Sequence, residues 1–315
     1  MELQPIQTEQ RPGFFQTVFL NERGLRAGWR LLVFFAMLIA LQQIAGLIAK
    51  LFVHPASTSP TPSRGISPTV ALPEMVAFGF LLLASWMMSR IEKRDIGQYG
   101  LPLKSSGFLS QFAFGYLFWG FLPLALLLCV MRVLHVFYFG HLALHQAQIL
   151  YWGFTWWGVF LLVGLLEEYL LRGYLLYTLA DGIGFWPAAI VLAALFALGH
   201  SRNSGETRIG VIMTALFAIF ASVTLWRTGN LWLAVGAHAG WDWGESFFFG
   251  TNDSGLPAQG HLLNSHIAGP DWLSGGTVGP EGSLLTLILM LVMTMLAYFL
   301  LRRPSRKPAL MITTR

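Results

Sequence analysis

The sequence is poor in charged residues and in cysteine. Only 11% of its 315 residues are charged and 55% are apolar, whereas a soluble domain carries about 25% charged residues. Water is therefore not the main solvent of this chain. The one cysteine, Cys129, lies in an apolar stretch, which excludes a disulfide framework and a cysteine-rich metal site.

Long apolar stretches dominate instead. A helix needs about 20 mostly apolar residues to cross the hydrocarbon core of a bilayer. Eight stretches qualify or nearly do, near 29–53, 71–89, 108–133, 151–178, 185–200, 209–226, 230–249 and 283–301. The fifth is short and the seventh is rich in Gly and polar residues, so we expect both inside the bundle. The sequence predicts an all-α, polytopic transmembrane bundle of about eight spans.

These spans divide the chain into five predicted parts. They are an N-terminal segment (1–28), three spans (29–150), four further spans (151–250), an extracytoplasmic loop (251–282), and a last span with a basic tail (283–315). The first part mixes Glu with Arg and offers no short apolar core, so we expect no signal peptide. The loop is rich in Gly, Pro, Ser and Thr, which is typical of irregular structure.

The basic residues predict an orientation. Most Lys and Arg residues fall on the side of the two termini, whereas the opposite side holds only Arg64, Arg202 and Arg208. This bias indicates that both termini are cytoplasmic and that the protein is a multi-pass protein of the plasma (inner) membrane. The net charge of +5 does not indicate nucleic-acid binding, because the basic residues flank the spans and form no continuous face.

A few ionisable residues lie inside the predicted spans, where each costs a few kcal/mol or more and therefore needs a partner or a purpose. Once residues near the ends of the spans are set aside, the remaining ones are all in the second half of the chain: Glu167, Glu168, Arg172, His200, His238, Asp242 and Glu245.

The fourth span contains the pattern EExxxR. Glu168 and Arg172 are four residues apart and share a helix face, in the order that favours an ion pair. A structural salt bridge would explain this pair, but it leaves Glu167, which points about 100° away, unexplained. A carboxylate removed from water becomes a stronger base, so Glu167 is a candidate general base or acid.

Two later spans contribute histidines. His200 ends the fifth span, where a capping role is the alternative to a functional one, and His238 shares a face with Asp242 in the seventh. The carboxylate of Asp242 could fix the imidazole tautomer, and the two side chains could bind a metal, polarise a carbonyl or form an interhelical clamp. At about 1.5 Å per residue, all three spans bring these groups close to mid-bilayer depth, which predicts one shared cavity.

The three motifs together resemble the CAAX protease and bacteriocin-processing (CPBP or Abi) family of intramembrane endopeptidases, which includes the Rce1-type prenyl-protein proteases. The family pattern is EExxxR, then FxxxH, then HxxxN or HxxxD. It matches Glu167, Glu168 and Arg172, then Phe196 and His200, then His238 and Asp242. The resemblance covers roughly residues 150–250, and the earlier spans share only their hydrophobic character.

The resemblance implies a helix bundle with a conical catalytic cavity inside the membrane. Glu167 would activate water with help from His200, His238 and Asp242 would stabilise the oxyanion, and Glu168 with Arg172 would support them, beside Phe196. The prenyl-protein branch usually has Asn at the position of Asp242. Because an ionised Asp repels an oxyanion, Asp242 must be protonated, orient His238 or bind a metal.

No cofactor is required by the sequence. Glu167, His200, His238 and Asp242 could together hold a divalent metal such as Zn²⁺ with an open water position. The helix-borne zinc signature HExxH is absent, and we favour a metal-independent general base.

The predicted function is hydrolysis of a peptide bond in a membrane-anchored or lipidated protein or peptide, such as a prenylated CAAX end or a bacteriocin leader. A non-catalytic scaffold or immunity protein that uses the same cavity for binding is the alternative. A proton-coupled carrier would have two related halves, whereas the buried charges here occupy only one half.

Overall fold

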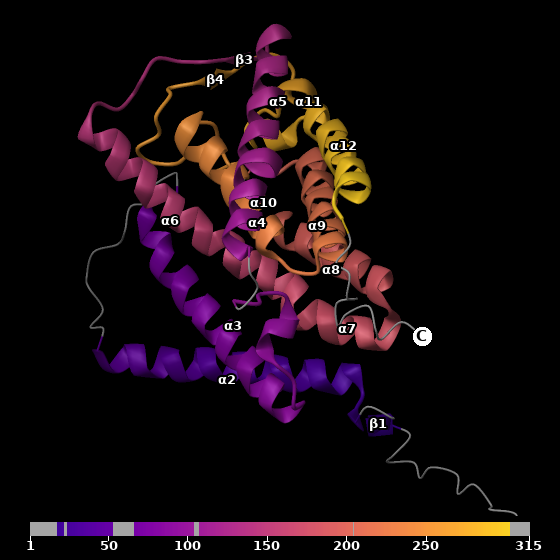
Figure 1. Ribbon diagram of the computed structural model, residues 1–315. Helices are drawn as coiled ribbons and strands as arrows, with labels where there is room; N and C mark the ends of the chain where they lie inside the picture. The colour runs from indigo at the N-terminus through magenta and orange to yellow at the C-terminus, as the bar shows by residue number, and fades with distance from the viewer. Residues whose placement is uncertain (1–17, 22–23, 53–65, 104–106, 204, 303–315) are drawn as a thin grey trace, which may run out of the picture.

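The computed structural model describes residues 18–21, 24–52, 66–103, 107–203 and 205–302. Most of the predicted N-terminal segment and nearly all of the basic tail lie outside these residues. The described chain is mostly helical, with four strands of two residues each (Figure 1). The strands form two small antiparallel pairs: β1 (Leu20–Asn21) with β2 (Gly24–Leu25), and β3 (Phe137–Tyr138) with β4 (His266–Ile267).

Helices occupy all eight stretches that the sequence indicated. Of the first seven stretches, four form single helices: α2 (Ala27–Phe52), α3 (Ala71–Ile91), α8 (Phe185–His200) and α9 (Arg208–Thr228). Three contain a π-helical turn: α4–η3–α5 (Phe108–Phe114, Gly115–Phe121, Leu122–Val133), α6–η4–α7 (Ala147–Leu170, Leu171–Leu175, Leu176–Ile183) and α10–η5 (Trp232–Asp242, Trp243–Phe248). The eighth is α12 (Leu284–Leu300), and short helical turns η1 (Pro68–Val70), η2 (Ile96–Tyr99), α11 (Asp271–Ser274) and η6 (Pro280–Gly282) connect the helices.

Five helices of the described chain are long and apolar enough to cross a membrane, and α8 and α12 are shorter apolar helices. This arrangement confirms a polytopic helical membrane protein. The prediction that the seventh stretch lies inside the bundle holds, because every residue of α10 is buried. The same prediction for the fifth stretch is wrong. One face of α8 is buried, but Ile190, Leu195 and Leu198 on its other face are more than half exposed.

The central position of α10 depends on glycine. Gly236 and Gly240 are four residues apart on α10, and a Cβ on Gly240 would lie 2.2 Å from the carbonyl oxygen of Tyr116. Gly115 and Gly120 face α10 from η3, where the π-helical turn brings residues five apart onto one face. Small residues at such a seam let two helix backbones approach closely within a membrane bundle. This contact holds the helix that carries His238.

The helix that carries the two glutamates bends just after them. The backbone of Gly173 has φ −82° and ψ −125°, outside the helical range, within the π-helical turn η4. Arg172 lies in this turn and is buried. The bend separates α6, which reaches the centre of the bundle, from α7, which lies with α2 at one end of the molecule (Figure 1).

The segment 250–282 covers the opposite end, together with β3 and α5 (Figure 1). Much of it is irregular, as its composition predicted, but it also contains β4 and α11 and is closely packed. The amide of Leu262 donates to the carbonyl of Phe247, and the amide of Gly255 donates to that of Val278. Val278 itself is fully buried. The segment is therefore part of the folded body and borders the site described next.

Candidate functional site

One cavity of about 690 Å³ lies among α3, α6, α8, α9 and α10. Its wall includes all four residues that the sequence indicated as a possible reaction centre: Glu167 from α6, His200 from α8, and His238 and Asp242 from α10. Phe196 also lines it, whereas Glu168 and Arg172 do not. Three helices thus bring the predicted polar groups to one cavity.

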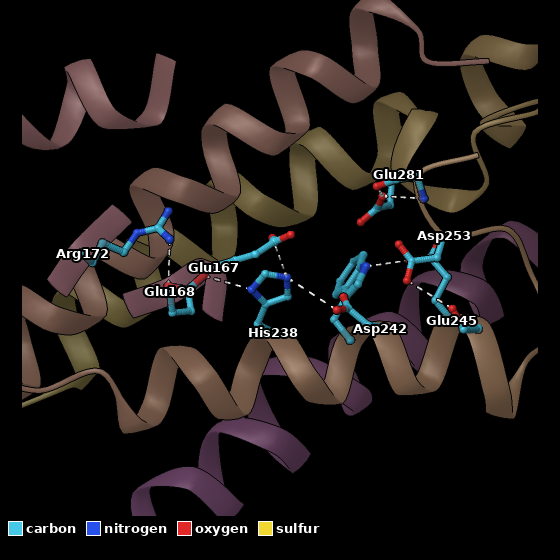
Figure 2. A network of polar contacts seen from close by, with 11 residues as sticks. Glu167, Glu168, Arg172, His238, Asp242, Glu245, Asp253 and Glu281 are labelled. Carbon is cyan, nitrogen blue, oxygen red and sulfur yellow. Dashed lines mark hydrogen bonds and ion pairs between the residues drawn. The ribbon is translucent and has the colours of Figure 1, made fainter. Parts of the chain in front are cut away.

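Behind the cavity wall, Glu168 forms a buried link between the guanidinium of Arg172 and the imidazole of His238. Its Oε2 accepts a hydrogen bond of 2.8 Å from Nη1 of Arg172, one helical turn further along the chain. Its Oε1 lies 3.0 Å from Nδ1 of His238, and this nitrogen donates to the carboxylate. Glu168 has no exposed surface. Figure 2 shows this row of contacts from Arg172 through Glu168 to His238.

The other ring nitrogen of His238 faces the cavity between two carboxylates. Its Nε2 lies 3.6 Å from Oε2 of Glu167 and 3.5 Å from Oδ2 of Asp242. Both distances exceed those of a hydrogen bond, so Nε2 remains available to a bound molecule. The ring edge of His238 also meets Phe217, with centroids 4.9 Å apart. His238 is therefore oriented by Glu168 and Phe217, and not mainly by Asp242 as the four-residue spacing suggested.

Glu167 and His200 are less enclosed. The Glu167 side chain is 29% exposed and reaches the cavity, in contrast to its fully buried neighbour Glu168. His200 donates from Nδ1 to the carbonyl of Phe196 at 3.1 Å and packs against the Phe196 ring. Within the described part of the chain, no hydrogen bond or ion pair joins His200 to Glu167. Phe196 lies between His200 and Arg172, whose guanidinium carbon is 5.8 Å from the ring centre.

The donor atoms of this site do not fit a preformed metal centre. A zinc site holds its ligands about 2.0–2.3 Å from the ion, so their donor atoms lie close to one another. Among the described residues, no three donors from Glu167, His200, His238 and Asp242 lie within 4.8 Å of one another. The set that does meet this distance is a different one, Glu245, Asp253 and Glu281.

Several residues of the cavity wall were missed from the sequence. Glu74 and Asn203 lie at helix ends, where polar side chains are ordinary, and Asp253 and Glu281 lie in a segment whose composition indicated a loop. Glu245 stood out as an ionisable residue within a span but had no predicted partner. No local spacing links these acidic residues, because the fold of segment 250–282 brings them together.

The fold and the site define a polytopic membrane protein with an ionisable cavity inside its helix bundle. Residues 149–244 match the family model described as type II CAAX prenyl endopeptidase Rce1-like, so this part of the chain is similar to that family. The resemblance drawn from the three motifs is thereby confirmed. No curated protein and no solved structure matches the chain.

Proposed function

We propose that the protein is an intramembrane endopeptidase in which Glu167 activates water to hydrolyse a peptide bond. The observation that carries the proposal is the position of Glu167: it reaches the cavity and lies 3.6 Å from Nε2 of His238. His238 is in turn held by the buried Glu168 and Arg172. The match to an endopeptidase family over residues 149–244 supports the same conclusion.

The proposed reaction begins when Glu167 takes a proton from a water molecule. The water oxygen attacks the carbonyl carbon of the scissile bond, and the carbonyl oxygen becomes an oxyanion. His238, as an imidazolium whose Nδ1–H is bound to Glu168, donates from Nε2 to that oxyanion. The carbon–nitrogen bond then breaks, and the leaving amine takes the proton that Glu167 has carried.

Asp242 and His200 take supporting roles in this proposal. Oδ2 of Asp242 lies 3.5 Å from Nε2 of His238, where an ionised carboxylate would favour the protonated imidazole. This position supports a role for Asp242 as a partner of His238. His200 lines the same cavity, and its Nε2 has no hydrogen-bond partner among the described residues, so we assign it to orienting the water or the substrate carbonyl.

The proposed substrates are membrane-anchored or lipidated proteins or peptides, including prenylated CAAX ends. The cavity combines the polar site with apolar side chains from three helices, among them Val163, Leu170 and Leu195. Such a wall suits a peptide bond close to a hydrophobic anchor. Spans within 151–250 would form the catalytic unit, in a plasma-membrane protein with both termini in the cytoplasm.

The test compares wild-type protein with Glu167→Gln in detergent, using quenched fluorescent peptides with and without a prenyl or other lipid anchor. Because general base catalysis contributes about 10²–10⁴-fold, Glu167→Gln should lower kcat by that factor while the thermal unfolding temperature stays unchanged. Asp271→Asn is the control, since Asp271 is an exposed acid absent from the cavity wall and its replacement should leave cleavage at the wild-type rate. Equal cleavage by wild type and Glu167→Gln would contradict the proposal.

A strong chelator added to the same assay tests the metal-independent mechanism separately. Cleavage should persist in the chelator if Glu167 acts directly on water. If no peptide of the panel is cleaved by the wild type, the binding scaffold becomes the better account of the cavity.

A further inference from the structure

Three acidic side chains meet at the end of the cavity that segment 250–282 covers. Glu245 comes from η5, Asp253 from the loop that follows, and Glu281 from η6 just before α12. One oxygen from each lies within 4.8 Å of the others. Figure 2 shows this group on the far side of Asp242 from Arg172.

The three carboxylates are shielded from solvent. Glu245 has no exposed surface and Glu281 is 8% exposed, while Asp253 is partly buried. Asp253 and Glu281 also line the cavity, so water and small ions have a path to them from that side.

Protein donors satisfy only part of this group. Trp241 Nε1 donates to Oε2 of Glu245 at 2.8 Å, and Ser246 Oγ donates to Oδ2 of Asp253 at 3.1 Å. Ser254 donates to Oε2 of Glu281 from both its amide and its hydroxyl. In each carboxylate one oxygen is engaged, and within the part of the chain that the structure describes no hydrogen bond reaches the other.

The clearest case is Oε1 of Glu245, which is buried and has no hydrogen-bond partner among the described residues. It faces the turn that carries Glu281, since a Cβ on Gly279 would lie 3.3 Å from it. A buried carboxylate oxygen without a partner costs on the order of 1–3 kcal/mol or more. The site therefore lacks one positively charged or donating group.

No protein cation supplies that group. Among the described residues, no Lys, Arg or His nitrogen lies within 4.0 Å of Glu245, Asp253 or Glu281. Burial raises the pKa of Asp253 to about 6, and burial together with the nearby Asp253 raises the pKa of Glu281 to about 7. In both groups burial is the largest cause of the shift in pKa.

We propose that Glu245, Asp253 and Glu281 bind a divalent cation of the oxygen-preferring class, Ca²⁺, Mg²⁺ or Mn²⁺. Carboxylate oxygens are the ligands that these hard cations prefer, and water from the cavity completes their coordination. An all-oxygen set does not favour Zn²⁺, which prefers nitrogen and sulfur. The ion links η5, segment 250–282 and the start of α12, and so fixes the wall at this end of the cavity.

This ion site is separate from the reaction centre. Asp253 and Glu281 line the same cavity as Glu167 and His238, but the reaction proposed above uses none of the three ligands. The ion is therefore a structural one, and its removal loosens the cover of the cavity without removing the base.

Direct binding tests the proposal. Wild-type protein in detergent is passed over a chelating resin and titrated with CaCl₂, MgCl₂ or MnCl₂ by calorimetry, and thermal unfolding is followed in parallel. We expect one ion per chain and a higher unfolding temperature. The double variant Asp253→Asn/Glu281→Gln should weaken ion binding more than about 10-fold. Loss of one group that only supports a ligand already weakens metal binding by about that factor, and this variant removes two ligands. Asp271→Asn, an exposed acid of the same segment, should bind like the wild type.

Two further variants keep the result decisive. Glu167→Gln should bind the ion as tightly as the wild type, which separates this site from the reaction centre. Glu245→Gln removes a ligand singly, should the double variant fail to fold. The proposal is overturned if the wild type binds none of the three ions at millimolar concentration, or if Glu167→Gln loses binding while the cluster variants retain it.

Discussion

Buried carboxylates lie at two places beside the cavity, and their surroundings differ. Glu168 is neutralised within the protein, because Arg172 and His238 each bond to one of its oxygens. The group of Glu245, Asp253 and Glu281 has hydroxyl, amide and indole donors but no cationic partner among the described residues. The first group is a permanent part of the fold. The negative charge of the second group must be balanced by a proton or an ion from the solution.

The largest effect should come from breaking the internal pair. Arg172→Met leaves Glu168 buried with only half of its charge partners, and loss of one partner of a buried pair costs roughly 3–5 kcal/mol. We expect a correspondingly large fall in the unfolding temperature in detergent. The double variant Glu168→Gln/Arg172→Met removes both charges and should recover most of this loss. A single variant as stable as the wild type would show that the pair is not what neutralises Glu168.

Removal of the imidazole should affect activity more than stability. His238→Ala eliminates the donor proposed for the oxyanion, and the loss of one such donor costs about 10²–10³-fold in kcat. His141→Ala removes an exposed histidine outside the cavity and serves as the control. Steady-state cleavage of an anchored peptide gives kcat for both variants. An unchanged kcat in His238→Ala would show that another group stabilises the oxyanion.

The acidic group should reveal itself through pH when cations are removed. The pKa values of Asp253 and Glu281 are raised in the folded protein, so the folded state holds protons that the unfolded state releases. Their contribution to stability is therefore largest below the ordinary carboxyl pKa, about 4, and is lost as pH rises toward about 7. Unfolding temperatures measured in chelator should fall over this range, and added Ca²⁺, Mg²⁺ or Mn²⁺ should reduce the fall. In the double variant Asp253→Asn/Glu281→Gln, the unfolding temperature measured in chelator should depend less on pH.

The smallest effect is expected at the boundary between the two groups. Asp242 lies 3.5 Å from Nε2 of His238, too far for a hydrogen bond. Asp242→Asn should therefore reduce kcat less than about tenfold, which is roughly 1.4 kcal/mol of barrier. A loss as large as that of His238→Ala would instead give Asp242 a direct part in the reaction.

Much of the fold could be predicted because length and apolar character are local properties of the sequence. The eight helical stretches and the interior position of α10 followed from runs of apolar residues and from the Gly and polar residues of the seventh stretch. The exposed face of α8 could not be predicted, because a short apolar helix has the same kind of sequence whether lipid or protein covers it. The π-helical turns at 115–121 and 171–175 were also missed, since each changes only the local hydrogen-bond pattern.

The reaction centre was more predictable than the acidic group. Four-residue spacing placed Glu168 with Arg172, and the depth of three spans placed Glu167, His200 and His238 at one cavity. The contact of Glu168 with His238 required the packing of α6 on α10 at Gly164, where a Cβ would lie 3.1 Å from the carbonyl of Val235. The roles of these residues stay predictions. The acidic group joins one residue of a span with one from the loop that follows and one from the end of segment 250–282, and no periodicity relates them.

The central claim is that Glu167 acts on water and not on the peptide itself. Hydrolysis of an anchored peptide in water labelled with heavy oxygen, followed by mass spectrometry of product and enzyme, tests it most directly. If Glu167 acts on water, we expect one labelled oxygen in the new carboxyl terminus of the product and no label in Glu167. We expect Glu167→Gln to give no product above background over the same time. Label in the Glu167 side chain, or product from Glu167→Gln at the wild-type rate, would contradict it.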